Sequence, residues 1–443
     1  MAAGSRRWGG PESGAGVDLR AGLSYTGPME YQRRLADGRL QQLLADFPAV
    51  MINGPRAAGK TTTARQVAAE TVSLDSPADS AAFKADPDDA LRGRREPLLL
   101  DEWQEVPEVL GAVRRAVDSD PHPGRFIVTG SVRGELENRV WPGTGRFIRM
   151  SMYGLTEAEM QTTLDKQSVG FLDKVASSDV SAFARGQTRP RLRDYLELAT
   201  RGGFPEVALR RLSQAARSTW LESYISQVIT RDAIAVMPRG DPQKMRAYFE
   251  ALALQTAGTP LDKTLIDAAG VGKDAAAGYE GLFENLFLTE RLPGWTKKAF
   301  SRFTELPKRY IVDPALAANS AHVGLQGILG DSDLLGRTLD TFITAQLRPL
   351  WSLTATRVKP YHLRTKGGRQ EIDLLLETED KKVLAFEFKA SSAPSAHDAR
   401  HLLWLRSLLE DRLVAGAVMH TGPDVFRLSD RVLALPISTI WGA

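Results

Sequence analysis

The sequence of 443 residues contains no cysteine. This absence excludes disulfide bonds, thiolate metal sites and cysteine nucleophiles, and it favours a reducing cytoplasmic location. Long hydrophobic runs are missing too, because stretches such as Pro97–Leu100 are far shorter than the roughly 20 apolar residues that cross a bilayer. Arg6 and Arg7 are not followed by an apolar segment. We therefore expect neither a secretory signal nor a membrane partner.

A strong excess of one charge is also absent. Lysine and arginine number 57 against 54 aspartates and glutamates, for a net charge of +3 and a pI near 9.0. Averaged over the chain, this balance is too mild to indicate nucleic acid. The 43% hydrophobic and 25% charged content is that of a globular protein. The length predicts two or three domains.

Short apolar segments alternate with polar helical stretches in the first part of the chain. This pattern predicts an α/β domain with a parallel sheet over residues 30–190, after a disordered Gly, Ala, Ser and Arg-rich tail at 1–29. The expected strands are 49–53, 71–74, 97–101, 126–129 and 147–150. The expected helices are 31–47, 61–70, 106–118 and 131–140. Residues 156–189 are polar without a clear pattern, so we expect loop and irregular helix there.

The remaining chain divides into a helical connector and a second α/β domain. The connector covers residues 191–330 and regains strand character at 308–313. The last domain, at 331–443, is predicted to have a helix near 336–347 and strands at 358–364, 371–377 and 383–388. No repeat of 20–50 residues is present.

One segment carries a complete phosphate-binding pattern, G-x-x-x-x-G-K-[ST]. Its glycines allow main-chain N–H groups to point at phosphate oxygens, and the following helix adds the positive end of its dipole. Lys60 would contact the β- and γ-phosphates, and Thr61 would contact Mg²⁺. We therefore expect ATP and Mg²⁺ to bind here. The nucleotide-binding residues are Gly54, Pro55, Arg56, Ala57, Ala58, Gly59, Lys60, Thr61 and Thr62.

A second pattern follows in Leu98–Glu102, where an apolar strand ends in two carboxylates. Asp101 is predicted to hold Mg²⁺ through water, and Glu102 to polarise the attacking water. This acidic pair favours an ATPase over a kinase. Thr129 or Ser131, after the next core strand, either senses the γ-phosphate or only caps a helix.

Arginines gather after that strand, at Arg133, Arg139, Arg146 and Arg149. One of them is a candidate arginine finger, which stabilises charge during phosphoryl transfer. We select Arg146; the alternative is an ordinary solvated arginine. If Arg146 acts on a second chain, the active form is a homo-oligomer.

The order of motifs resembles a prokaryotic family of AAA-type ATPases with a nuclease-like C-terminal half. The resemblance covers roughly residues 30–440. The matching strings are Gly54–Thr62, Leu100–Pro107, Thr129–Ser131, Arg201–Glu206, Tyr310–Asp313, Glu371–Asp373 and Glu387–Lys389. The resemblance implies an AAA-type P-loop NTPase domain, a helical or winged-helix-like connector, and a restriction-endonuclease-like domain of the PD-(D/E)xK type. Two departures are a longer loop around Trp141–Arg146 and Asp340 in a late helix where the family usually has glutamate.

The charged strands near the C-terminus are a candidate catalytic site. Glu387 and Lys389 are two residues apart and so project to one face, where Asp373 of the neighbouring strand can join them. Two carboxylates suit Mg²⁺, and a lysine can position a water for phosphodiester hydrolysis. Asp340 is a further potential metal ligand. A solvent-exposed hairpin with paired charges is the alternative, and such a domain can also bind DNA without cutting it.

The connector contains a candidate DNA-binding element. Residues 265–271 and 273–287 resemble a helix-turn-helix, and 291–309 holds six basic residues, Arg291, Lys297, Lys298, Arg302, Lys308 and Arg309, with Trp295, Phe300 and Phe303 among them. A basic hairpin after a helix-turn-helix is typical of a winged domain that contacts DNA phosphates. Ala275–Ala277 offers few base-reading side chains, so sequence-specific readout is not expected. The alternative is an interdomain helical hairpin.

The sequence thus predicts an ATPase whose nucleotide state controls a DNA-binding half that is either nucleolytic or catalytically silent. In the second case the half would serve a regulatory ATPase and bind DNA or a protein partner.

Overall fold

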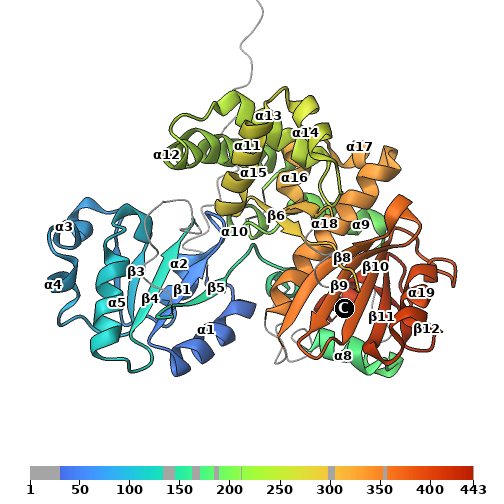
Figure 1. The fold of residues 1–443 in the computed structure, drawn as a ribbon, viewed down its shortest axis with the longest axis horizontal. Helices are drawn as coiled ribbons and strands as arrows, with labels where there is room; N and C mark the ends of the chain where they lie inside the picture. The colour runs from blue at the N-terminus through green and yellow to red at the C-terminus, as the bar shows by residue number, and fades with distance from the viewer. Residues whose placement is uncertain are drawn as a thin grey trace, which may run out of the picture. The chain divides into compact units, whose positions relative to one another are not determined.

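The computed structural model describes residues 30–132, 145–161, 170–183, 189–210, 212–297, 305–352 and 357–442 (Figure 1). All elements below belong to one compact unit, residues 33–443. The predicted tail at 1–29 and the predicted helix at 131–140, apart from its first two residues, lie outside the described residues. No described helix is long and apolar enough to cross a membrane.

The first sheet has five parallel strands in the order β2-β3-β4-β1-β5, which confirms the predicted parallel α/β domain. The strands are β1 (Ala49–Asn53), β2 (Glu70–Ser73), β3 (Leu98–Asp101), β4 (Phe126–Gly130) and β5 (Ile148–Ser151). The helices are α1 (Leu35–Asp46), α2 (Lys60–Arg65), α3 (Pro77–Ala85), α4 (Pro87–Leu91), α5 (Val109–Ser119) and α6 (Glu157–Met160). The predicted helix 61–70 already ends at Arg65, because the chain must enter β2 at Glu70.

Alternate residues of these strands pack on opposite faces of the sheet, as the two-residue period of a strand requires. Met51, Leu100 and Val128 contribute to a core with α5. Their neighbours Ile52, Leu99 and Ile127 contribute to a second core with α1. Figure 1 shows α5 and α1 on opposite sides of the sheet. Burial of both faces explains why these strands read as unbroken apolar runs.

The connector is mainly helical, as predicted. Its helices are α9 (Leu192–Arg201), α10 (Pro205–Ala208), α11 (Gln214–Gln227), the π-helix η3 (Val228–Ala233), α12 (Ile234–Val236), α13 (Pro242–Leu254), α14 (Asp262–Ala269), α15 (Lys273–Asn285), α16 (Pro314–Ser320) and α17 (Leu325–Gly330). Gly270 ends α14 in the left-handed region, with φ of 62°, so the predicted turn between α14 and α15 is present. Strands β6 (Thr289–Leu292) and β7 (Lys308–Ile311) pair antiparallel after it.

The last domain is a six-stranded mixed sheet in the order β12-β13-β11-β10-β9-β8. Its strands are β8 (Val358–Arg364), β9 (Glu371–Thr378), β10 (Val383–Lys389), β11 (Leu413–His420), β12 (Phe426–Ser429) and β13 (Val432–Pro436). Helix α18 (Ser332–Trp351) packs on one face through Phe342 and Leu347, and α19 (Arg400–Leu409) packs on the other through Leu402 and Leu405. The predicted helix and three predicted strands are all found here.

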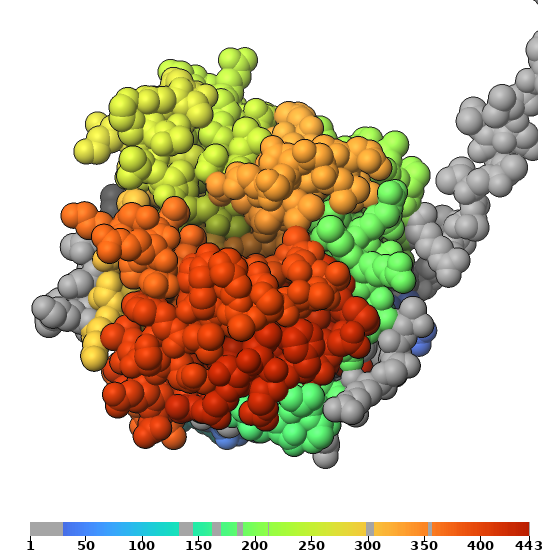
Figure 2. Space-filling view, turned by 90° about the vertical axis from the view of Figure 1, so that its right-hand side faces the viewer, coloured from blue at the N-terminus to red at the C-terminus, as the bar shows by residue number. Residues whose placement is uncertain are grey.

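The described residues of 156–189 contain short helices, in keeping with the expected loop and irregular helix, but their packing was not predicted. Helix α8 (Phe171–Ser177) buries Phe171, Leu172 and Val175 in the same core as β10 and β11 of the last sheet. Figures 1 and 2 both show this green segment beside the red C-terminal strands. Helix α8 contributes only three buried apolar residues to this contact, too few to stand out as a period in a polar sequence. A segment assigned by sequence to the first domain therefore packs against the last one.

Candidate functional site

The phosphate-loop pattern lies between the carboxyl end of β1 and the start of α2. Gly54 passes so close to the chain after β5 that a Cβ there would lie 1.9 Å from the carbonyl oxygen of Met152. Gly59 caps α2 with φ of 92°, a conformation that favours glycine. The loop geometry thus requires glycine at both positions, and the predicted strand–loop–helix context is present.

Lys60 is held beneath this loop. Its Nζ donates to the carbonyl oxygens of Gly54, at 3.0 Å, and Pro55, at 2.8 Å. The side chain is buried, and burial lowers the pKa of Lys60 to about 8, with the charge of Glu102 opposing the shift. The ammonium group therefore lies beside the main chain that would surround a phosphate.

Three side chains converge at the carboxyl ends of β3 and β4. The Thr61 hydroxyl donates to Asp101 Oδ1 at 2.8 Å, and the Thr129 hydroxyl donates to the same oxygen. Asp101 is buried. A hydroxyl and a carboxylate oxygen in direct contact are the ligand types that Mg²⁺ takes in proteins. The residues at this position fit the metal that the sequence predicts.

Glu102 follows Asp101 in the left-handed region, with φ of 57°. Such a backbone conformation costs energy for a residue other than glycine and concentrates at functional sites. Glu102 Oε2 accepts hydrogen bonds from the amide of Gln104 and from Ser131 Oγ, the latter at 3.5 Å. Ser131 was one of two predicted hydroxyls and lies at Glu102, whereas Thr129 lies at Asp101. Gln104 was not predicted, because glutamine two residues after a carboxylate is not a distinctive pattern.

The loop is also bonded to the connector, through Arg56. Arg56 Nε forms an ion pair with Asp232 of η3 at 2.8 Å. The hydroxyl of Tyr224 in α11 donates to the carbonyl oxygen of Arg56 at 3.4 Å. Burial raises the pKa of Asp232, and Arg56 opposes the shift. Sequence reasoning did not find Asp232, since an acid in a helical region carries no signal for a contact so distant in the chain.

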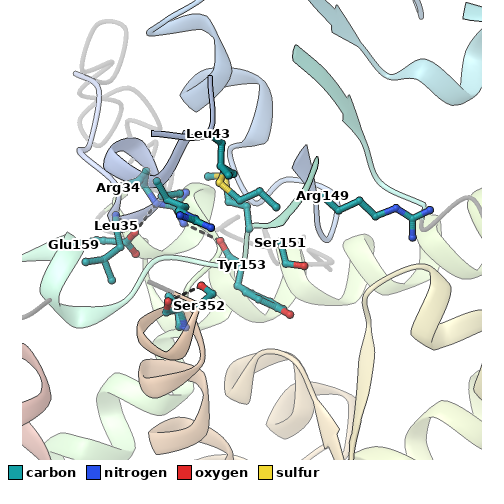
Figure 3. Close-up of a pocket in the computed structure, with 13 residues that line it drawn as sticks. Arg34, Leu35, Leu43, Arg149, Ser151, Tyr153, Glu159 and Ser352 are labelled. Atoms are coloured by element: carbon teal, nitrogen blue, oxygen red, sulfur yellow. Dashed lines mark hydrogen bonds and ion pairs between the residues drawn. The ribbon is translucent and has the colours of Figure 1, made fainter. Parts of the chain in front are cut away.

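Arg34, before α1, supports the loop from another side. Its guanidinium donates to the carbonyl oxygens of Ala58, at 2.9 Å, and Tyr153, at 2.8 Å, and pairs with Glu159 at 3.0 Å. Arg34, Tyr153 and Glu159 line a cavity of about 230 Å³ between α1, β5 and the end of α18. Figure 3 shows Arg34 beside Glu159 and Tyr153, with Arg149 on the opposite side. The described lining includes no residue of 54–61, so the cavity adjoins the phosphate loop without containing it.

Two of the family-like strings meet at Asp313. One carboxylate oxygen accepts from the Gly203 N–H at 2.7 Å, and the other accepts from Ala315 and Leu316, at 2.9 and 3.0 Å, to cap α16. The Gly203 carbonyl in turn accepts from the Leu155 N–H, after β5, at 2.6 Å. The Leu155–Gly203 hydrogen bond connects the first domain with the connector, and Asp313 holds Gly203 in place for it.

Arg146 lies away from the phosphate loop of its own chain. It precedes β5 and pairs with Asp118 of α5 at 2.7 Å, and both side chains are exposed. Because β5 runs parallel to β1, a residue before β5 and the loop after β1 lie at opposite edges of the sheet. A role in phosphoryl transfer would need a second chain. Arg133 and Arg139 lie outside the described residues.

Comparisons with known proteins agree with this geometry. Residues 46–161 match a family model described as an AAA domain. These residues form an AAA-type P-loop domain. Residues 170–326 and 335–440 match two domains of unknown function, DUF8612 and DUF4143.

Two curated relatives are uncharacterized proteins of Mycobacterium bovis and Mycobacterium tuberculosis. Each is 27% identical over 418 residues, covering 93% of this chain and 85% of the relative. Among solved structures, the Walker-type ATPase PABY2304 of Pyrococcus abyssi has a TM-score of 0.40 at 13% identity, covering 66% of this chain and 96% of its own. The DNA clamp loader delta protein of Bacillus subtilis has a TM-score of 0.24 at 13% identity, covering 57% and 88%.

The predicted C-terminal residues come together, but with cations among them. Lys308 Nζ contacts Asp340 and lies 3.0 Å from Asp373 Oδ1. Lys389 Nζ lies 2.9 Å from Glu387 Oε2, as the shared face of the strand predicts. Within the described part of the chain, no group of three His, Cys, Asp or Glu is placed to hold a metal. As they stand, Asp340, Asp373 and Glu387 do not fit Mg²⁺.

The expectation that the hairpin at 291–309 presents its side chains to DNA is wrong for Lys308, Arg309 and Trp295. Lys308 and Arg309 are buried in ion pairs, Arg309 with Glu280 at 2.6 Å. Trp295 is buried in the core of the last sheet. None of these side chains is accessible to a phosphate backbone. Lys298, Phe300, Arg302 and Phe303 lie outside the described residues.

A different basic surface lies on β8, the edge strand, and on the turn after it. Five exposed cations and no acid occur between residues 357 and 370. They are Arg357, Lys359, Arg364, Lys366 and Arg369. Sequence reasoning read 358–364 only as a strand, although the run of basic residues without an acid was a usable signal. We call these five residues the β8 basic strip.

Proposed function

We propose that the protein binds and hydrolyses ATP at Gly54–Thr61. The observation that carries this proposal is the junction of Thr61, Asp101 and Thr129 beside Lys60 and Glu102. Main-chain N–H groups of the loop and the ammonium of Lys60 would bind the β- and γ-phosphates. Thr61 and Asp101 would hold Mg²⁺, which neutralises developing charge when bound.

Glu102 is the proposed general base. Its carboxylate would orient and deprotonate the attacking water, while Ser131 and Gln104 fix its direction through the hydrogen bonds described above. Thr129 would keep Asp101 oriented. An arginine finger from Arg146 would require a homo-oligomer, and we propose this as the active form.

We further propose that the ion pair between Arg56 and Asp232 couples the nucleotide state to the connector. A triphosphate beside Arg56 would compete with Asp232 for the guanidinium group. Loosening of this ion pair would free η3 and α11 from the loop, and so change how the connector is held.

The Asp232→Asn variant tests this coupling. Removing one negative charge near the phosphates should tighten Mg-ATP binding by about fivefold, since partly buried charges a few Å apart interact by about 1 kcal/mol or more. Calorimetric titration of nucleotide measures the change. Glu222→Gln, on α11 but paired with Arg246, is the matched control and should bind as wild type. Unchanged affinity in Asp232→Asn would refute the coupling.

For the C-terminal half we propose a nuclease-like domain that binds DNA through the β8 basic strip. Exposed cations without intervening acids attract a phosphate backbone irrespective of sequence. A winged-helix-like connector and DNA cleavage stay part of the proposal. The contacts of Lys308 favour the alternative, a regulatory ATPase whose C-terminal half does not cut.

DNA affinity over a range of salt tests the strip. Replacing Lys359, Lys366 and Arg369 by alanine should weaken binding and reduce the slope of log K against log salt by about 2 to 3, measured between about 50 and 200 mM salt. The matched control replaces Lys84, Arg92 and Arg95, three exposed cations of the first domain. Equal losses of DNA affinity in both triple variants would mean that DNA does not bind at the β8 basic strip. Running the titration with ATP in Glu102→Gln shows whether nucleotide changes the affinity.

Cleavage is assayed separately. Metal-dependent cutting of single-stranded, duplex and branched DNA by wild type, lost in both Lys389→Ala and Asp373→Ala, would establish the nuclease. Binding without cutting would establish the silent alternative.

A further inference from the structure

The carboxylates expected to hold a metal in the C-terminal domain are paired with cations of the chain itself. Lys308 Nζ reaches Asp340 Oδ2 and Asp373 Oδ1, and it is buried. Asp340 Oδ1 accepts from the hydroxyls of Tyr310, at 2.8 Å, and Thr344, at 3.3 Å. Asp373 Oδ2 accepts from the Phe388 N–H at 2.9 Å. All four carboxylate oxygens therefore have a donor.

The third carboxylate is paired with a lysine at one oxygen only, since its buried Oε1 has no hydrogen-bond partner among the described residues. Glu387 Oε2 faces Lys389, and Glu387 Oε1 lies 3.3 Å from His401 Nδ1. Burial acts to lower the pKa of Lys308, but Asp340 and Asp373 raise it well above its usual value, so the lysine stays charged. A buried ammonium compensated by two carboxylates is a closed charge cluster.

Strand β7 brings Lys308 to this place from the connector. Successive residues of a strand point to opposite sides. Lys308 and Tyr310 accordingly face Asp340, while Arg309 between them pairs with Glu280 and Asp262 of the connector. The chain between β6 and β7 is also bonded to β8: the His362 N–H donates to Pro293, and the Trp295 N–H donates to His362, at 3.0 and 2.6 Å. Lys308 is thus held by the pairing of β7 with β6, and the chain that follows β6 is bonded to β8.

We propose that the ammonium group of Lys308 is the resident cation of the Asp340–Asp373 pair and excludes divalent metal from it. This inference rests on the proposed function in one respect: the nuclease-like architecture is the reason to expect a metal at these carboxylates. A divalent ion and the lysine need the same carboxylate oxygens, so the domain takes up metal only if β7 withdraws. This position is a cation site that the chain fills with its own side chain.

Thermal unfolding of the full chain tests the proposal, with and without about 5 mM Mn²⁺. Lys308→Met leaves two buried carboxylates facing each other, so its midpoint in EDTA should fall by several degrees. Mn²⁺ should restore most of the loss in Lys308→Met, because an ion that binds only the folded state raises its stability. Lys308→Met/Asp373→Asn, which lacks the second carboxylate, should not be restored. Mn²⁺ bound at the nucleotide site would shift the midpoint of every variant alike, so it does not affect the comparison between variants. A midpoint of Lys308→Met that does not respond to Mn²⁺ overturns the proposal.

A second measurement does not depend on the folding of Lys308→Met. Electron paramagnetic resonance counts the Mn²⁺ bound to wild type and to Asp373→Asn, which keeps the Lys308–Asp340 pair. The proposal predicts equal numbers. One additional ion in wild type overturns it, while ATP turnover and DNA retention, measured on the same samples, show independently whether the proposed function holds.

Discussion

Glu102→Gln is expected to bind Mg-ATP with an affinity within a few fold of wild type and to lose about 10²- to 10⁴-fold in turnover. Glutamine retains the size of glutamate and can still bond Ser131, but it cannot take a proton from water. Among the described residues the hydrogen bonds of Glu102 go to Gln104 and Ser131 and not to the phosphate loop, so loss of its charge should change ground-state binding only a little. A phosphate-release assay gives the rate, and a nucleotide titration gives the affinity.

Glu105→Gln is the matched control for this prediction. Glu105 is exposed in the same short segment and should keep wild-type turnover. Wild-type turnover in Glu102→Gln would remove Glu102 as the base and transfer that role to another acid near the loop, with Asp232 the first candidate.

Asp313→Ala is expected to destabilise the connector and to weaken the hydrogen bond by which Gly203 joins it to the first domain. The buried carboxylate accepts from three main-chain N–H groups, of Gly203, Ala315 and Leu316. Burial raises the pKa of Asp313, and these hydrogen bonds oppose that shift. Truncation leaves all three donors unsatisfied, which should cost about 3 kcal/mol or more and lower the thermal midpoint by roughly 3 to 4 °C or more.

Asp331→Ala supplies the comparison. Asp331 also caps a helix, accepting from Asp333 and Leu334 at the start of α18, but it is exposed. Its removal should cost only about 1 kcal/mol. Equal midpoints for the two variants would mean that Asp313 acts as an ordinary cap and that its bond to Gly203 adds nothing to stability.

Most of the fold followed from local patterns. Strand β1 and three strands of the last sheet, β8, β9 and β10, were predicted to within about two residues, because a short apolar run bounded by polar turns is typical of a buried strand. Strands β11, β12 and β13 were not predicted. The phosphate loop was predictable since its chemistry requires glycine and lysine at fixed spacing. The contact of Thr61 and Thr129 with Asp101 follows from parallel strands whose carboxyl ends meet at one edge.

What the sequence did not predict depends on contacts between distant segments. The ion pair of Arg56 with Asp232, and that of Lys308 with Asp340 and Asp373, join residues from different parts of the chain. A basic residue in a turn-rich segment has the same pattern whether it faces solvent or a buried acid. Lys308 was therefore read as a phosphate contact, although the fold places it inside.

The most direct measurement is a titration of the folded full chain with Mg-ATP, beside Lys60→Ala. We predict saturable binding of one nucleotide per chain in wild type and its loss in Lys60→Ala, because the ammonium of Lys60 lies beneath the phosphate loop. Equal affinities for the two proteins, or no affinity of wild type for any purine triphosphate, would contradict the account.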